Sequence, residues 1–315
     1  MRYLFITALV LFLFGCGQPT KQNTNIDKAK PVAYITTAGD KIVFLEDYYR
    51  VYLKTIKTQY ASRNKIYEGE IQDSIFSKYF SKSEYSELVK ITLASPIKDT
   101  TGLRNYVSEI TNNHQKIEEL ITSALAASNK FLKNDSVTVY IMPCNSDIEK
   151  INTEMGGVSG LTAGSKQIVI SIDPGVNSWQ EMLPYDIAHE FNHTYWTKMN
   201  LKTAQWTLLN YLVFEGRADS YAHLICPDVI CPWTKVLSEK MEADLWNKIK
   251  SQLKNQDMAY QYNIMFGSKN EYPLWGGYTL GYHIVQSALK NHPELSPVEW
   301  ANLAPEKILE MSDYK

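Results

Sequence analysis

Two histidines, His189 and His193, stand four positions apart in this chain, and Glu190 directly follows the first of them. Residues four apart on a helix lie one turn along the same face, so both imidazoles can converge on one metal ion while Glu190 points beside it. His-Glu-x-x-His is a zinc signature in which the glutamate is the general base. Two unrelated surface histidines are the alternative, but the apolar residues Leu183 and Ile187 give this helix a face to bury.

A third ligand is expected because a catalytic zinc site normally has three protein ligands and one open position. Glu215 follows His193 by 22 residues, a spacing that returns the chain to the metal if a second helix runs antiparallel to the first. Asp219 lies one turn further on the same face and could accept the spare N–H of His189 or His193. His223 shares this face but lies about 12 Å along the axis from Glu215, so we interpret it as a partly buried histidine.

The elements that must position these residues are two predicted helices, over residues 178–199 and 204–224. Before them, the β-rich segments 137–142 and 167–172 each end at a turn and predict two strands. Further helices are expected over 103–132, whose apolar residues recur at helical spacing, and over 236–255, 278–291 and 304–312. The sequence therefore predicts an α+β fold that is predominantly helical, with a small sheet before the helix of His189 and His193.

No internal repeat or interior linker interrupts the body of the chain, so we expect one domain over residues 36–315. Its first part, 36–100, carries scattered tyrosines without a motif and is expected to form short helices. Residues 101–315 are expected to be the catalytic core. Residues 31–100 could cover the site and restrict access to it.

The first 15 residues have the pattern of a signal peptide. Arg2 provides a positive start, and the apolar run that follows at 3–14 is too short to cross a membrane as a helix. Residues 13–16, Leu-Phe-Gly-Cys, resemble a bacterial lipobox, which implies cleavage before Cys16 and attachment of lipid to its thiol. The alternative is a plain secretory signal in which Cys16 has no role.

Residues 16–35 are mostly polar and are expected to be a flexible tether between the lipid and the folded body. Gly17 is not an aspartate, so the usual signal for retention in the inner membrane is missing. We therefore expect an exported protein that is lipid-anchored in the bacterial cell envelope, at the outer membrane if the cell is Gram-negative.

The composition excludes several classes of function. Of the 315 residues, 44% are hydrophobic and 21% are charged, which is typical of a globular protein. Lys and Arg number 32 against 34 Asp and Glu, so the net charge of −2 argues against a nucleic-acid partner. The chain contains no run of about 20 apolar residues that could span a bilayer as a helix.

The cysteines predict one disulfide. Cys226 and Cys231 flank a short loop and are expected to pair, which the compartment of an exported protein permits. A second metal site is the alternative, but the loop between them contains no histidine. Cys144 is expected to be a buried thiol.

The chain resembles the predicted zinc-dependent proteases grouped as DUF2268, a domain of unknown function, over about residues 103–289. The resemblance rests on the order of the predicted elements and on four motifs: Gly-Gly-Val-Ser-Gly at 156–160, Ala-His-Glu-Phe-Asn-His at 188–193, Phe-Glu-Gly-Arg-Ala-Asp at 214–219 and Trp-Gly-Gly-Tyr-Thr-Leu-Gly-Tyr at 275–282. The spacing of Glu215 and Asp219 also resembles that on the second zinc helix of gluzincin metalloproteases. The resemblance implies a zincin-like fold, one zinc ion per chain and hydrolysis of peptide bonds.

The same resemblance implies a further catalytic residue near the C-terminus. In gluzincin-like sites, a tyrosine or histidine beyond the third ligand donates a hydrogen bond to the developing oxyanion. Tyr278, which follows two glycines at the start of a predicted helix, suits this role by analogy. Tyr282 and His283, one turn further along, are the alternatives, and all three could instead be ordinary residues of a packed helix.

Three functions are compatible with these residues. The first is an envelope-anchored zinc metallopeptidase whose peptide or protein substrate is held as an added strand on a sheet edge, for which the segment 158–172 is the candidate. The second is a zinc hydrolase of a non-peptide amide, such as cell-wall material. The third is a non-catalytic lipoprotein that uses the fold for binding or assembly, against which the intact Glu190 argues.

Overall fold

The computed structural model of the chain describes residues 29–269 and 271–314. The predicted signal peptide, Cys16 and most of the predicted tether lie outside the described residues. None of the helices in the described part is both long and apolar enough to span a membrane.

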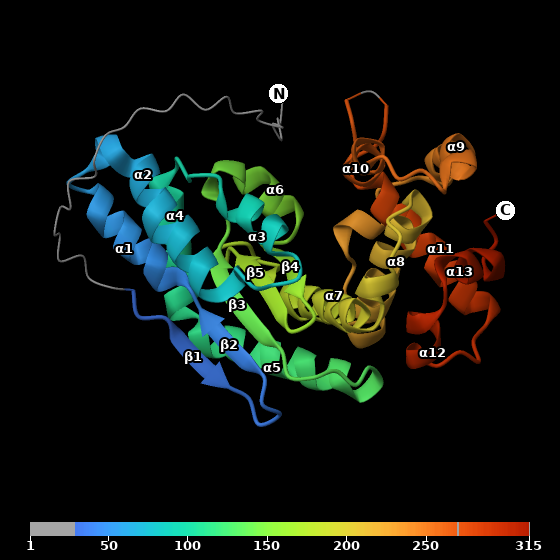
Figure 1. Cartoon of the computed structure of the whole chain (residues 1–315), viewed down its shortest axis with the longest axis horizontal. Helices are drawn as coiled ribbons and strands as arrows, with labels where there is room; N and C mark the ends of the chain where they lie inside the picture. The colour runs from blue at the N-terminus through green and yellow to red at the C-terminus, as the bar shows by residue number, and fades with distance from the viewer. Residues whose placement is uncertain (1–28, 270, 315) are drawn as a thin grey trace.

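A five-stranded mixed sheet lies at the centre of the N-terminal half (Figure 1). Its strand order is β1-β2-β3-β5-β4, with β1 Val32–Ile35, β2 Lys41–Phe44, β3 Thr138–Pro143, β4 Val158–Gly164 and β5 Gln167–Ile172. Strands β2, β3 and β5 are parallel, and the edge strands β1 and β4 are antiparallel to their neighbours. The strands predicted over 137–142 and 167–172 are confirmed as β3 and β5.

Helices make up most of the described chain. They are α1 Glu46–Ile56, α2 Arg63–Tyr67, α3 Ser86–Leu93, α4 Thr100–Asn112, α5 His114–Phe131, α6 Glu149–Glu154, α7 Trp179–Asn200, α8 Leu208–Ile225, α9 Glu239–Ile249, α10 Met258–Phe266, α11 Gly276–Asn291, α12 Pro297–Asn302 and α13 Pro305–Met311. The prediction of a predominantly helical α+β fold is confirmed, and α7 and α8 match the two helices expected to carry the site.

The single helix predicted over 103–132 is wrong, because two helices, α4 and α5, meet at Asn113. The side-chain amide of Asn113 donates a hydrogen bond to the carbonyl of Glu109 at 2.8 Å, so it satisfies a carbonyl at the end of α4. The apolar spacing continues across the break because each of the two helices buries an apolar face. This continuity concealed the boundary in the sequence.

Two strands lie in residues that the sequence assigned to the tether and to short helices. Strands β1 and β2 form a hairpin whose turn contains Gly39, with a φ of 89° that suits glycine. Strand β2 then pairs with β3 in parallel, with Lys41 opposite Thr138. Strands of four residues that pair with a partner so distant in sequence carry little local signal, and the tether therefore ends before Val32.

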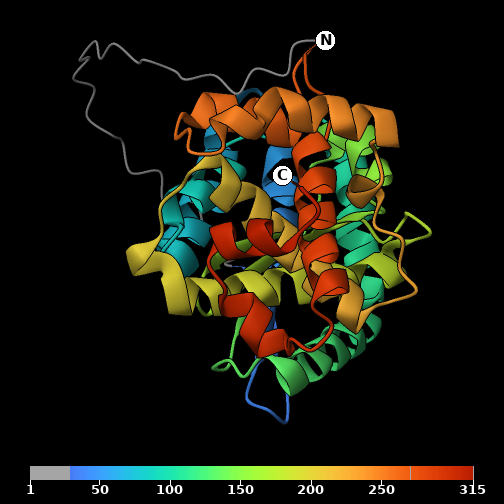
Figure 2. The same ribbon diagram turned by 90° about the vertical axis from the view of Figure 1, so that its right-hand side faces the viewer.

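The sheet separates two apolar cores because successive strand residues point to opposite faces. Ile42 and Ile141 face a core built with α5 and α7. Val43 and Tyr140 face a second core built with α1 and α4, which Figure 1 shows on the opposite side of the sheet from α5. A third core joins α8, α9, α10, α11 and α13, the C-terminal helices that lie in front in Figure 2. Helices α7 and α8 therefore lie where the sheet meets the C-terminal helices.

Candidate metal centre

Helices α7 and α8 bring the three predicted ligands together. The Nε2 atoms of His189 and His193 lie 3.0 Å apart, and Oε2 of Glu215 lies 3.4 Å from each of them. Tetrahedral zinc with bonds of about 2.0–2.2 Å holds its ligand atoms roughly 3.3 Å apart, so this triangle of donors has the right size for one ion. All three side chains are buried. The site can therefore hold a divalent cation such as zinc.

Close backbone packing sets the position of Glu215 on α8. A Cβ at Gly216 would meet the carbonyl of Gly281 on α11, and a Cβ at Gly281 would meet the carbonyl of Leu212 on α8. The two helices therefore touch backbone to backbone, and each glycine is required by lack of space. This contact holds the helix face that carries Glu215 toward α7.

Asp219 orients one of the ligands, as the spacing predicted. Its Oδ1 lies 3.0 Å from Nδ1 of His189 and also accepts hydrogen bonds from Nε1 of Trp233 at 3.0 Å and from the hydroxyl of Tyr185 at 3.2 Å. A proton on Nδ1 leaves the Nε2 lone pair of His189 free for a metal. The tertiary structure thus selects His189 over His193 as the partner of Asp219.

The electrostatics of the ligands favour a bound cation. Burial by itself lowers the pKa of His189, but its contacts with Asp219 and Glu215 outweigh burial and raise that pKa well above its usual value. Burial by itself raises the pKa of Glu215, but the adjacent imidazoles of His193 and His189 outweigh burial and lower it to about 2. The centre therefore holds a buried, negatively charged carboxylate, and a bound cation would neutralise this charge.

His193 is held by packing. Its ring stacks on Phe214 with centroids 3.9 Å apart and an interplanar angle of 15°. Trp196 and Trp206 surround the other edges of Phe214, with centroids 4.8 and 5.3 Å from it. Among the described residues, Nδ1 of His193 has no hydrogen-bond partner. The orientation of this ligand therefore depends on aromatic contacts where that of His189 depends on a carboxylate.

Strand β4 holds the predicted base. The hydroxyl of Thr162 lies 2.7 Å from Oε2 of Glu190 and 3.0 Å from its backbone carbonyl oxygen. At Gly160, a Cβ would lie 2.5 Å from Cγ and 2.6 Å from Oε1 of Glu190, so only glycine leaves room for this carboxylate. Neither residue was predicted from the sequence to be part of the site. Gly160 stood in one of the quoted motifs, whereas nothing in the sequence marks Thr162.

The charges of the candidate centre act on Tyr278. Burial raises the pKa of Tyr278 well above its usual value, and the carboxylates of Glu215, Asp219 and Glu190 raise it further. The hydroxyl therefore keeps its proton and can donate a hydrogen bond. Its ring packs edge-on against Phe266, with centroids 5.5 Å apart.

The two alternatives to Tyr278 have other partners. Tyr282 packs edge-on against His223, with ring centroids 6.3 Å apart, and its pKa is raised to about 12 by burial and, to a smaller extent, by the charge of Asp219. His283 lies 2.9 Å from the carboxylate of Glu242 on α9 through its Nδ1. His283 is therefore engaged by Glu242, whereas Tyr282 remains an alternative to Tyr278.

The chain matches the sequence model of one protein family. The family model described as "Predicted Zn-dependent protease (DUF2268)" matches residues 117–310. The chain belongs to the DUF2268 family. The match spans all three ligands, Glu190 and Tyr278, and it confirms the resemblance inferred from the motifs. No significant match was found among curated proteins or among solved structures.

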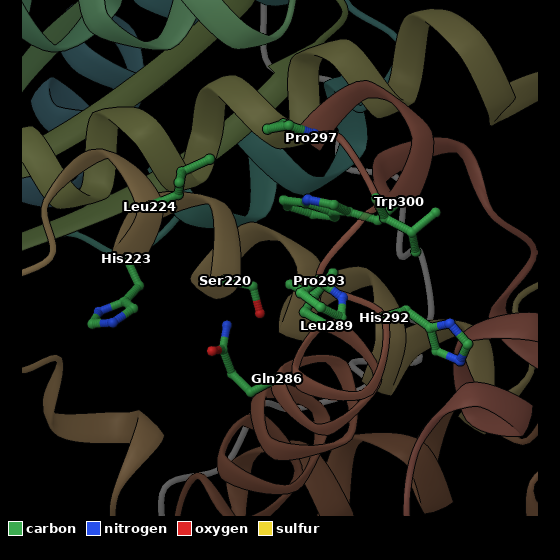
Figure 3. A pocket seen from close by; sticks show the side chains of 10 residues that line it. Ser220, His223, Leu224, Gln286, Leu289, His292, Pro293, Pro297 and Trp300 are labelled. Carbon is green, nitrogen blue, oxygen red and sulfur yellow. The ribbon is translucent and has the colours of Figure 1, made fainter.

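His223 lies outside the ligand set of this DUF2268 chain. It lines a cavity of about 290 Å³ together with Ser220, Gln286 and Trp300, which Figure 3 shows between α8, α11 and the C-terminal segment. It also borders a cavity of about 230 Å³ with Tyr185. The interpretation of His223 as a partly buried histidine away from the metal agrees with the structure.

The predicted disulfide between Cys226 and Cys231 is absent, because both are free thiols in the structure. Cys231 is buried near Tyr185 and Asp219, behind the metal ligands, and burial raises the pKa of its thiol well above the usual value. Cys226 is only half-buried at the end of α8, and burial raises its pKa to about 11. The Cys231 thiol is thus part of the packing under the DUF2268 site, and loop length alone gave the wrong pairing. Cys144 is buried, as expected.

Proposed function

We propose that this chain is a zinc-dependent metallopeptidase that uses His189, His193 and Glu215 as zinc ligands and Glu190 as the general base. The observation that carries the proposal is the convergence of one donor atom from each ligand within 4.8 Å, with the Glu190 carboxylate held beside them by β4. When bound, zinc supplies Lewis-acid polarisation of a carbonyl and lowers the pKa of water to about 7. The remaining steps belong to residues of the chain.

Glu190 takes a proton from the attacking water and later returns it to the leaving amine. The hydrogen bond from Thr162 holds Oε2 in one orientation and leaves Oε1, on the side of Gly160, to exchange the proton. Asp219 keeps His189 in the tautomer that presents Nε2. The hydroxyl of Tyr278 donates a hydrogen bond to the oxyanion that develops during attack.

The substrate is a peptide held along the outer edge of β4. This strand is the edge of the sheet on the side of α7, and Ser159, Gly160 and Leu161 are partly exposed. A peptide that pairs there adds a strand to the sheet and passes directly beside Glu190. Trp196 and Phe214, both half-buried next to His193, offer apolar contact to a substrate side chain.

We also propose that the protein is exported and anchored by lipid. The lipobox-like end of the signal peptide and the polar residues after Cys16 support a lipid anchor in the cell envelope. The folded body begins at β1, so the tether proposed between lipid and enzyme spans about residues 16–31.

The deciding experiment compares Glu190→Gln with Glu181→Gln, an exposed glutamate on the same helix. The full-length chain, purified in detergent, is assayed for zinc by elemental analysis and for hydrolysis on a broad peptide panel by mass spectrometry. We expect about one zinc per chain in all three proteins, activity in wild type and Glu181→Gln, and loss of hydrolysis in Glu190→Gln. Equal hydrolysis by Glu190→Gln, or a wild type that binds no zinc, would overturn the proposal. Zinc-dependent cleavage of a cell-wall amide without peptide turnover would favour the non-peptide hydrolase.

A further inference from the structure

A short segment from the N-terminal part of the chain, residues 83–85, crosses one end of β4. The backbone N–H of Tyr85 donates a hydrogen bond to the carbonyl of Ala163 at 3.0 Å. Ala163 lies where the register of β4 against β5 shifts, between Thr162 and Gly164, and its carbonyl bonds to Tyr85 outside the sheet. We therefore place this carbonyl at the outer edge of β4, on which a substrate strand would pair. The position is therefore already occupied by the chain itself.

Tyr85 also reaches the helix of the metal ligands. Its hydroxyl lies 3.1 Å from Oγ1 of Thr197, which is one turn after His193 on α7. One residue thus bridges β4 and α7 at the same end of the site. Because the half-buried Tyr85 contacts both elements, we place its side chain at the end of the path that a peptide lying on β4 would follow.

Further contacts fix the segment in place. Ser165 donates a hydrogen bond to Oε1 of Glu84 at 2.5 Å, and the same carboxylate fills the space where a Cβ of Gly164 would be. The hydroxyl of Ser83 bonds to the side chain of Gln167 on β5. Residues 83–85 are therefore attached to the sheet at three consecutive positions, and we call them the end wall.

The end wall divides β4 into an open part and a covered part. Ser159, Gly160 and Leu161 are partly exposed, whereas the next three residues, up to Gly164, are buried. Among the described residues, no backbone group outside the sheet bonds to this open part. Because Glu190 contacts β4 at Gly160 and Thr162, and a strand rises about 3.3 Å per residue, the wall begins within about two residues of the reacting position.

We propose that the end wall limits the substrate on one side of the scissile bond to about two residues. The inference rests on the proposed peptidase function and adds its substrate class: peptides cut near one chain end, with a long chain accepted only on the opposite side. It assigns the N-terminal part of the chain, which lies largely outside the family match, a role in specificity.

Cleavage-site mapping tests this inference. Wild type is incubated with peptides of about 6 to 20 residues with free or blocked ends, and products are assigned by mass spectrometry. We expect the released fragment on one side to contain no more than about two residues whatever the length of the peptide. Cleavage confined to either end of the peptide supports the end wall. The end that is cut shows the direction in which the substrate pairs with β4. Internal cleavage at comparable rates overturns the inference but leaves the peptidase proposal intact, whereas absence of zinc-dependent cleavage overturns both.

Variants of the end wall provide a second test of the inference. Tyr85→Ala and the double variant Glu84→Ala with Tyr85→Ala should raise internal cleavage about tenfold or more relative to terminal cleavage, with zinc content unchanged. Tyr60→Ala, an exposed tyrosine in the same part of the chain, is the matched control and should keep the wild-type pattern. Thermal unfolding checks that each variant is folded. Folded wall variants that keep the wild-type product pattern would contradict the assignment.

Discussion

Nδ1 of His189 lies 3.0 Å from Oδ1 of Asp219, so a carboxylate on α8 sets the direction of the His189 ring on α7. Asp219 is fully buried and is itself held by Trp233 and Tyr185. The relationship fixes the ring orientation of His189 and keeps a proton on Nδ1 when Nε2 gives up its own proton to bind a metal.

Asp219→Asn should weaken zinc binding by about 10- to 100-fold, because the neutral amide stabilises the Nδ1–H tautomer less well than the carboxylate. Competition with a chromophoric chelator measures the change in Kd. Asp228→Asn, which alters an exposed aspartate in the loop after α8, serves as the control and should leave Kd unchanged. An Asp219→Asn protein with wild-type Kd would show that His189 needs no such partner.

Gly160→Ala should abolish most activity while zinc remains bound. The added Cβ would lie 2.5 Å from Cγ of Glu190, so the base must move away from the position that β4 holds for it. Gly69→Ala is the matched control because a Cβ there meets nothing within 4 Å. Steady-state kinetics on a cleaved peptide and zinc analysis separate the two effects. Full activity in Gly160→Ala would place the working position of Glu190 elsewhere.

Tyr278→Phe should lower kcat by roughly 10²- to 10³-fold, the usual loss for one oxyanion donor, with little change in zinc content. Tyr282→Phe should change kcat by less than about threefold, because the Tyr282 ring packs against His223. The measurement is kcat for both variants on the same peptide. The reverse order of effects would reassign the donor to Tyr282.

The pair of Glu242 and His283 should make stability depend on pH. Burial opposes ionisation of Glu242, but hydrogen bonds with His283 and Tyr314 outweigh burial and lower its pKa below the usual 4.5. A lowered carboxyl pKa stabilises the fold above the unfolded pKa, and this stability is lost as pH falls through the folded pKa. Glu242→Gln should therefore cost about 1 kcal/mol at pH 7 and progressively less below pH 4.5. A difference in Tm that stays constant from pH 7 to about pH 3 would refute this account.

Cys226 and Cys231 should remain free thiols in the purified protein. Reductant should leave Tm unchanged, and alkylation without prior reduction should label both thiols in the unfolded chain. In the native chain Cys231 should react much more slowly than Cys226, because Cys231 is buried and its pKa is raised further. Peptide masses after alkylation identify each site. A peptide that joins the two cysteines would restore the disulfide that their spacing suggested.

Most of the metal site could be predicted from local spacing, and most of its surroundings could not. On any helix, two residues four apart, such as His189 and His193, lie on the same face. The spacing to Glu215 brings it back to them if the next helix runs antiparallel to the first. By contrast, Thr162 reaches Glu190 across 28 residues through strand pairing and packing. No local periodicity encodes such a contact. The same limit applies to β2, which pairs with β3 across almost a hundred residues, whereas β1 was missed because four residues show too little alternation.

The sequence by itself determined which side chains can bind a metal and which carboxylate can act as a base, because helical geometry relates sequence spacing to position within one element. Only the tertiary structure decided that Asp219 contacts His189, that the carboxylates of the centre act on Tyr278 while His283 pairs with Glu242, and that residues 83–85 cover the end of β4. These outcomes depend on how separate elements pack, and packing is set by the shapes and burial of many residues together.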